Sequence, residues 1–177
     1  SAIAFKDGKI GLVGDAATLR MDLRMFDTVI HIAGKHVYPG LIAPNVTLGL
    51  VEIEAVRATK DFLETGSIHP SVRSIIAYNA ESQIIPTVRS NGVLLAQITP
   101  RGGLISGTSS VVELDGWNWE DAAYHIDDGI HLNWPATPRK NSDEDEDKKK
   151  KGSPQTENHK MLIRQYFEKS RAYSKFY

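Results

Sequence analysis

Short apolar runs separated by turn residues dominate the first forty positions of the chain. The runs cover residues 2–5, 10–13 and 28–32, and the turn Lys6-Asp7-Gly8-Lys9 joins the first two. Such β-branched runs between turn residues predict strands. We therefore expect residues 1–38 to form a small β-layer.

The pattern changes after Pro39-Gly40. Leu41-Ile42-Ala43 is a short apolar segment typical of a strand that is buried on both faces. Apolar residues at helical spacing then predict a helix over 81–91, which ends at Asn91-Gly92. The nearly continuous apolar run 93–98 follows directly and predicts a buried strand. A helix that leads into a buried strand indicates a βαβ unit and a parallel sheet, and hence the α/β fold class.

The last third of the chain holds three different patterns. Residues 111–114 predict a short strand, and 117–123 predict one or two helical turns. Residues 139–154 join a block of acids to a block of lysines, without apolar residues to bury, and we expect a flexible, disordered linker. Residues 155–177 predict an amphipathic helix whose apolar stripe needs a covering surface. The stripe contains Leu162, Ile163, Tyr166, Phe167 and Tyr173.

Composition and charge narrow the classes of function. The 177 residues are 41% hydrophobic and carry a formal net charge of −1, so no broad basic field is present to attract nucleic acid. No apolar run is long enough for a membrane span, and we expect no retained signal peptide. Cysteine is absent, which excludes thiolate ligands and disulfides. These features leave a periplasmic, extracytoplasmic or cytoplasmic location equally open.

Several short motifs follow one another in a fixed order. Residues 34–42 read Gly-Lys-His-Val-Tyr-Pro-Gly-Leu-Ile after the N-terminal β-layer. Further along stand Asn91-Gly92-Val93, Pro100-Arg101-Gly102-Gly103, Ser106-Gly107-Thr108-Ser109 and Leu114-Asp115-Gly116-Trp117. Over residues 5–135 this order resembles the N-terminal portion of the amidohydrolase superfamily, in its imidazolonepropionase-like branch.

The resemblance implies a fold and a chemistry. The fold is a (β/α)8 TIM-like barrel beside a small β-sandwich, with residues 1–38 in the sandwich and 39–138 in the first part of the barrel. The chemistry is hydrolysis of amide or cyclic C–N bonds by metal-bound water at the carboxyl ends of the barrel strands. A complete barrel takes about 250 residues, of which this chain holds roughly a third. The chain therefore resembles a fragment.

The first metal-binding motif of that superfamily is degenerate in this chain. Positions expected to hold Asp, His and His hold Ala43, Asn45 and Thr47. Neither an amide nor a hydroxyl replaces imidazole as a ligand for zinc. No two of the six histidines stand at a ligand spacing. We therefore expect no metal in this chain alone; zinc or another divalent metal needs later ligands from the full-length protein.

The resemblance leaves the catalytic residues unassigned and offers six candidates for substrate binding. Asn45 and Thr47 stand at the expected mouth of the barrel, although they can equally close the end of the strand. His69 stands before Pro70 in a predicted loop, and loops carry function. Arg101 and a predicted glycine-rich loop containing Ser106 and Thr108 can cradle an anion, or form a structural turn.

Two functions remain after these considerations. One is an amidohydrolase-like hydrolase in which this chain supplies the first barrel units and is inactive by itself. The other is a non-catalytic, barrel-like binding or assembly subunit. In either case we expect the remainder of the same polypeptide, or another copy of it, to cover the exposed strands, since a two-stranded parallel unit cannot cover both of its faces. A small-molecule substrate is possible in both cases.

Overall fold

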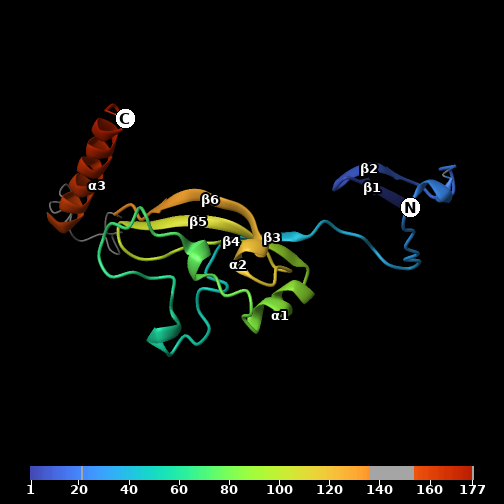
Figure 1. Cartoon of the computed structure of the whole chain (residues 1–177), viewed down its shortest axis with the longest axis horizontal. Helices are drawn as coiled ribbons and strands as arrows, with labels where there is room; N and C mark the ends of the chain where they lie inside the picture. Colours follow the sequence, from blue (N-terminus) through green and yellow to red (C-terminus); the bar gives the residue numbers. More distant parts are fainter. Residues whose placement is uncertain (21, 136–153, 177) are drawn as a thin grey trace, which may run out of the picture. The chain divides into compact units, whose positions relative to one another are not determined.

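The computed structural model describes residues 1–20, 22–135 and 154–176. The chain divides into two compact units, Ser1–Tyr38 and Pro39–Tyr177. Figure 1 shows the elements of each unit along the chain. Each unit is described separately below.

The first unit is built on a β-hairpin. Strand β1 (Ala2–Lys6) pairs antiparallel with β2 (Lys9–Gly14) through a two-residue turn at Asp7 and Gly8. Both turn residues have positive φ, 51° and 70°, which is the turn geometry that matches the twist of a hairpin. A single 3-10 turn, η1 (Leu23–Met25), follows the hairpin.

One predicted strand of this unit is absent. Residues 28–32 form no strand, so this prediction is wrong. The β-branched side chains remain exposed, Ile30 by 77%, for example. A strand needs a neighbouring ladder as well as local propensity, and no pairing to β1 or β2 is formed here.

The second unit contains a four-stranded mixed sheet in the order β3-β4-β5-β6. β3 (Leu41–Val46) runs parallel to β4 (Val93–Ile98). β5 (Ile105–Glu113) and β6 (Ala123–Leu132) each run antiparallel to their preceding neighbour. Helix α1 (Ile84–Ser90) leads into β4, as the sequence predicts. The prediction of a parallel sheet is thus correct only for the pair β3 and β4.

The described residues form an open mixed α/β sheet, and they contain no TIM-like barrel. A barrel of that kind needs helical crossovers between parallel strands, but β4, β5 and β6 follow one another as an antiparallel meander. The connection from β5 to β6 holds only the one-turn helix α2 (Trp119–Ala122). The predicted fold is therefore confirmed at the level of the α/β class and its first parallel pair.

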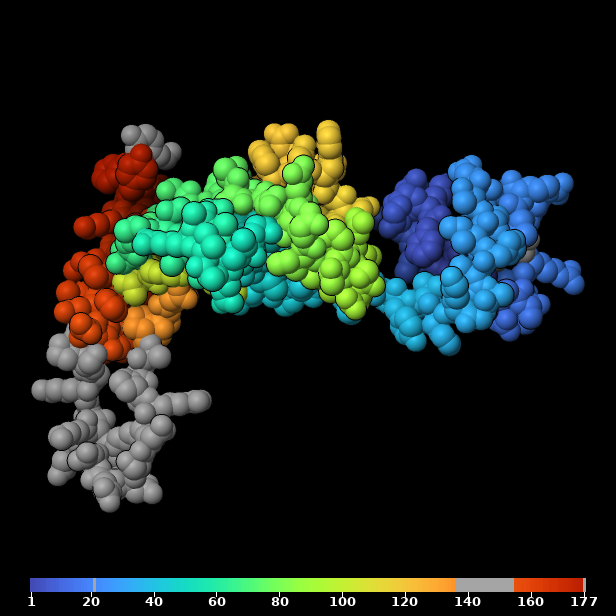
Figure 2. Space-filling model, turned by 90° about the horizontal axis from the view of Figure 1, so that it is seen from below, coloured from blue at the N-terminus to red at the C-terminus, as the bar shows by residue number. Residues whose placement is uncertain are grey.

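One face of the sheet carries the hydrophobic core. Ala96, Ile98 and Val112 project from β4 and β5, and none of them is exposed to solvent. The segment between β3 and β4 covers this face with the 3-10 helices η2 (Arg57–Thr59) and η3 (Ser74–Ala77) and with α1. Figure 2 shows this long connection, coloured cyan to green, spread over the unit. The core residues that it and α2 contribute are Leu50, Ile75, Tyr78, Ile85 and Ala122.

The helix near the carboxyl end is α3 (Pro154–Tyr173), where the apolar periodicity predicts one. Of its predicted apolar stripe only Ile163 is buried, while Leu162, Phe167 and Tyr173 are exposed. No helix in the described ranges is long and apolar enough to span a membrane. The predicted flexible linker, 139–154, falls on residues outside the described ones, apart from Pro154.

Strand β3 lies at an edge of the sheet. Leu41 and Ile42 are 60% and 62% exposed, so the prediction of a strand buried on both faces is wrong for this end of β3. The reason is that β3 has a neighbour on one side only in the described chain. An exposed edge with apolar side chains is a template for pairing with another strand.

We predict that the isolated chain self-associates, because an apolar parallel edge without a neighbouring strand lowers its free energy by pairing. Sedimentation velocity at increasing concentration tests this prediction. The expected result is a rise in the mean sedimentation coefficient with concentration. A monodisperse, cooperatively folding monomer at all concentrations would show that β3 needs no covering partner.

Candidate functional site

The carboxyl ends of the parallel strands β3 and β4 carry a group of polar side chains. In β4, Ala96 and Ile98 point into the core, so Gln97 between them points to the opposite face. In β3, Asn45 has a φ of 56°, a left-handed conformation that Asn tolerates better than most residues. These two residues begin the site.

Side chains bind both backbone groups of Asn45. Its N–H donates to Gln97 Oε1 at 3.1 Å, and its carbonyl oxygen accepts from Arg101 Nη2 at 2.6 Å. Arg101 follows β4 closely because Pro100 cannot donate to a ladder and the strand ends before it. The end of β3 is thus fixed by two side chains from β4 and the turn after it.

The network continues from β4 to β6. The Gln97 side chain donates from Nε2 to Asp128 Oδ2 at 2.5 Å. The other Asp128 oxygen, Oδ1, lies 3.6 Å from His125 Nδ1. Because Val111 of β5 pairs with both Gln97 and His125, the three residues form one row across the sheet. On the face opposite the core, polar side chains therefore connect β3, β4 and β6, and we call this set, Asn45, Gln97, Asp128 and His125, the polar row.

A bulge in β6 directs two neighbouring carboxylates, those of Asp127 and Asp128, to different partners. Ser109 pairs with Gly129 and Val111 with His125, so two steps along β5 correspond to four along β6. Asp127, in the bulge, has a φ of 55° and donates its N–H to Ser110 Oγ. Its carboxylate accepts from Arg73 Nε at 2.9 Å, whereas Asp128 binds Gln97.

Arg101 and Asp128 set the electrostatics of the site, and Arg73 and Asp127 form a separate ion pair. Burial lowers the pKa of His131, the positive charge of Arg101 lowers it further, and Asp128 opposes the shift. The hydrogen bond to Asp127 raises the pKa of Arg73. His131 is therefore held toward its neutral form beside a fixed cation.

The three positions at which the resemblance predicts metal ligands lie in two different surroundings. Ala43 and Thr47 both line an apolar cavity of about 310 Å³, together with Val46, Leu48 and Val88. Asn45 alone joins the polar network. Its carbonyl oxygen is already bound by the guanidinium of Arg101, whose charge repels a cation at that point. These residues do not fit a divalent metal.

Within residues 1–20, 22–135 and 154–176, no group of three or more His, Asp or Glu side chains is arranged to hold a metal ion. The His125 and Asp128 pair is the nearest approach to one in this network. Two such groups leave half of a four-coordinate zinc sphere unfilled.

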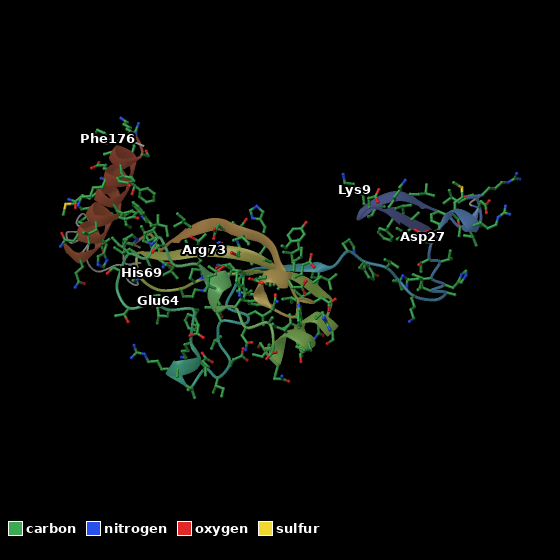
Figure 3. The ribbon with its side chains drawn as sticks, viewed as in Figure 1. Lys9, Asp27, Glu64, His69, Arg73 and Phe176 are labelled. Carbon is green, nitrogen blue, oxygen red and sulfur yellow. The ribbon has the colours of Figure 1, made fainter. Side chains whose placement is uncertain are left out.

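The other candidates for substrate binding have separate surroundings. His69 lies on the segment that runs beside β5 (Figure 3), and its N–H donates to the Ile105 carbonyl. Its Nε2 is buried and has no hydrogen-bond partner in the described chain. Ser106 donates to the Gly102 carbonyl at 2.6 Å and accepts from Asn133 Nδ2. Neither residue belongs to the polar row.

The predicted glycine-rich loop is wrong. Ser106, Gly107 and Thr108 lie inside β5, and only residues 102–104 form a bend. Small polar side chains suggest a loop, but here they pack in the interior of a sheet flanked on both sides. Ser109 and Ser110 are fully buried, and their hydroxyls bind the backbone of β6. Thr108 lines a second cavity with Arg73 and Asp127.

Sequence reasoning identified Asn45 and Arg101 and missed Gln97, Asp128, His125 and His131 as members of one network. A signal for Gln97 is present, because a polar residue interrupts the otherwise apolar run 93–98. Such a residue marks the face of a strand that is turned away from the core. The bulge of β6 gives no comparable pattern.

The comparisons with known proteins agree with this architecture. No family model matches the chain, and no curated protein matches it. A crystal structure of an amidohydrolase from Thermotoga maritima matches with a TM-score of 0.68 and 19% sequence identity. The match covers 98% of this chain and 43% of that one, so this chain spans less than half the length of the protein it is similar to. The chain thus shares the fold of part of an amidohydrolase.

We predict that Arg101→Gln raises the pKa of His131, because it removes a positive charge that disfavours the imidazolium. An NMR titration of the His131 ring protons measures this directly. The wild-type midpoint is expected below the ordinary value of 6.5. The midpoint of Arg101→Gln is expected between the wild-type midpoint and 6.5. Arg24→Gln in the first unit is the matched control and leaves the midpoint unchanged.

The same shift has a consequence for stability. The pKa of His131 is lower in the folded state than in the unfolded state. The contribution of neutral His131 to the free energy of unfolding is therefore complete above about pH 6.5, and it is lost as the pH falls through the pKa of the folded state. A wild-type midpoint at or above 6.5, or one that Arg101→Gln lowers, would contradict the proposed surroundings of His131.

Proposed function

We propose that this chain is part of an amidohydrolase-like protein that hydrolyses amide or cyclic C–N bonds. The observation that carries the proposal is the likeness of 98% of the chain to part of an amidohydrolase of known structure. The ordered motifs at 91–93, 100–103 and 114–117 support the imidazolonepropionase-like branch in particular. Because that likeness covers 43% of the other chain, the activity belongs to a longer assembly than the residues described.

The site in this chain supplies binding groups to such an assembly. Asn45, Gln97 and Asp128 present fixed donors and acceptors at the carboxyl ends of β3 and β4, where barrel enzymes bind their substrates. Arg101 supplies a positive charge beside the neutral form of His131. These groups can orient a polar substrate and stabilise negative charge on it. Water activation needs groups beyond those described.

A second candidate is a binding or assembly subunit without catalysis. Arg101 favours this second candidate. Its guanidinium binds the backbone carbonyl of Asn45, which stands where the resemblance predicts a metal ligand. A fixed guanidinium there stabilises the strand end without a metal. The two candidates differ in whether the full-length protein carries later metal ligands and hydrolyses anything.

We predict that the isolated chain, purified without chelator, binds far less than one zinc ion per chain and hydrolyses no amide. The physical reason is that its candidate positions hold Ala43, Asn45 and Thr47, which lack imidazole and carboxylate groups. Elemental analysis and an assay against acyclic and cyclic amides check both results. One tightly held metal ion per chain would contradict the prediction.

The full-length protein separates the two candidates. Hydrolysis of a cyclic or acyclic amide that is lost on adding a chelator and restored by zinc supports the hydrolase. Absence of hydrolysis by a correctly folded full-length protein, after loading with zinc, manganese or iron, supports the binding subunit.

A further inference from the structure

A second cavity lies on the face of the sheet that carries the core, opposite the polar row. It has a volume of about 370 Å³ and is lined by Pro70, Ser71, Arg73, Thr108, Asp127, Gly129 and Ile130. In β5, Thr108 lies four residues before Val112, which is in the core. By strand alternation Thr108 therefore points to the core side, away from Gln97. The cavity is separate from the polar row.

Two opposite charges face each other in this cavity. Arg73 Nε donates to Asp127 Oδ1 at 2.9 Å, and both side chains are partly exposed, by 42% and 46%. This single bond leaves the terminal guanidinium nitrogens of Arg73 and one oxygen of Asp127 available. A half-exposed ion pair contributes little to stability, so a ligand can open it at little cost. Figure 3 shows Arg73 over the middle of the sheet.

The backbone fixes where the two charges lie. Arg73 forms a parallel bridge with Thr108, and the Thr108 N–H donates to the Val72 carbonyl at 2.7 Å. The position of Asp127 is fixed by the bulge of β6 and by its N–H bond to Ser110 Oγ. A pair of charges held by an isolated β-bridge and a strand offers a preformed distance to a ligand.

The side chain of Thr108 adds a hydroxyl to the two charges. Thr108 is 9% exposed and lines the cavity, and its hydroxyl oxygen is not among the buried unpaired atoms of the described residues, so it stays accessible from the cavity. An accessible hydroxyl can donate to a ligand. Pro70 and Ile130 add apolar walls beside it.

We propose that this cavity binds a small zwitterion that carries a carboxylate and an ammonium group, namely a free α-amino acid with an apolar side chain. The carboxylate accepts from the Arg73 guanidinium and the Thr108 hydroxyl. The ammonium group donates to Asp127, and the side chain lies against Pro70 and Ile130. The balance of one cation and one anion in the cavity favours a zwitterion over a simple anion or cation. The inference is independent of the proposed hydrolysis.

Calorimetric titration of the whole chain with three probes tests the proposal. L-leucine carries both charges, 4-methylpentanoate lacks the ammonium group, and L-leucinamide lacks the carboxylate. We expect L-leucine to bind, and each of the other two to bind at least about tenfold more weakly. Equal affinity for all three, or no binding of L-leucine at millimolar concentration, would overturn the proposal.

Two variants locate the binding in this cavity. Asp127→Asn keeps a residue that tolerates positive φ, and Thr108→Val keeps the size of the side chain, so both preserve the local backbone. Each is expected to weaken L-leucine binding by at least about tenfold. Asp22→Asn is the matched control, since Asp22 is also paired with one arginine, Arg24, but outside the cavity. Equal loss in the control, or no loss in Asp127→Asn and Thr108→Val, would refute the assignment.

Discussion

The Gln97 side chain connects the strands of the second unit on the face opposite the core. Its amide oxygen accepts from the backbone of Asn45 in β3, and its amide nitrogen donates to Asp128 in β6. One side chain thereby fixes the end of an edge strand, β3, to a bulge in β6, three strands away. Without it, the Asn45 N–H and the Asp128 carboxylate lose partners at the point where β3 has no neighbour on its other side.

Arg101 completes this arrangement and changes its chemistry. The resemblance predicts a metal at the end of the first barrel strand, where it would orient groups by its charge. Here a guanidinium binds the backbone carbonyl of Asn45 directly, and it adds to burial in lowering the pKa of His131. A permanent side-chain cation can position and polarise a bound molecule, but it cannot generate hydroxide as a zinc ion does. We therefore propose that this chain contributes binding groups, and that other segments contribute the groups that activate water.

Local patterns predicted much of the fold. The hairpin at Asp7-Gly8, the helix 81–91 and the strand 93–98 each depend on turn residues or periodicity within a few positions, and each is present. The failures involve distant partners. The strand 28–32 is absent because no ladder receives it, and Ser106 to Ser110 form a central strand because β6 and the core supply the hydrogen bonds that a loop takes from water. In the site, Asn45 and Arg101 were visible as polar residues after strands, whereas Asp128 and His125 reach it only through the bulge of β6.

Amide hydrogen exchange at Asn45 tests the central claim, that side chains rather than a metal hold the end of β3. Gln97→Leu removes two hydrogen bonds, each contributing about 0.5–1.5 kcal/mol, so Asn45 exchange is predicted to accelerate by about tenfold or more relative to the wild type. Gln83→Leu, at an exposed glutamine outside the network, is the control and leaves the Asn45 rate unchanged. The account also predicts that zinc and chelator leave the wild-type rate unchanged. An Asn45 rate that responds to zinc or chelator and is unaffected by Gln97→Leu would contradict it.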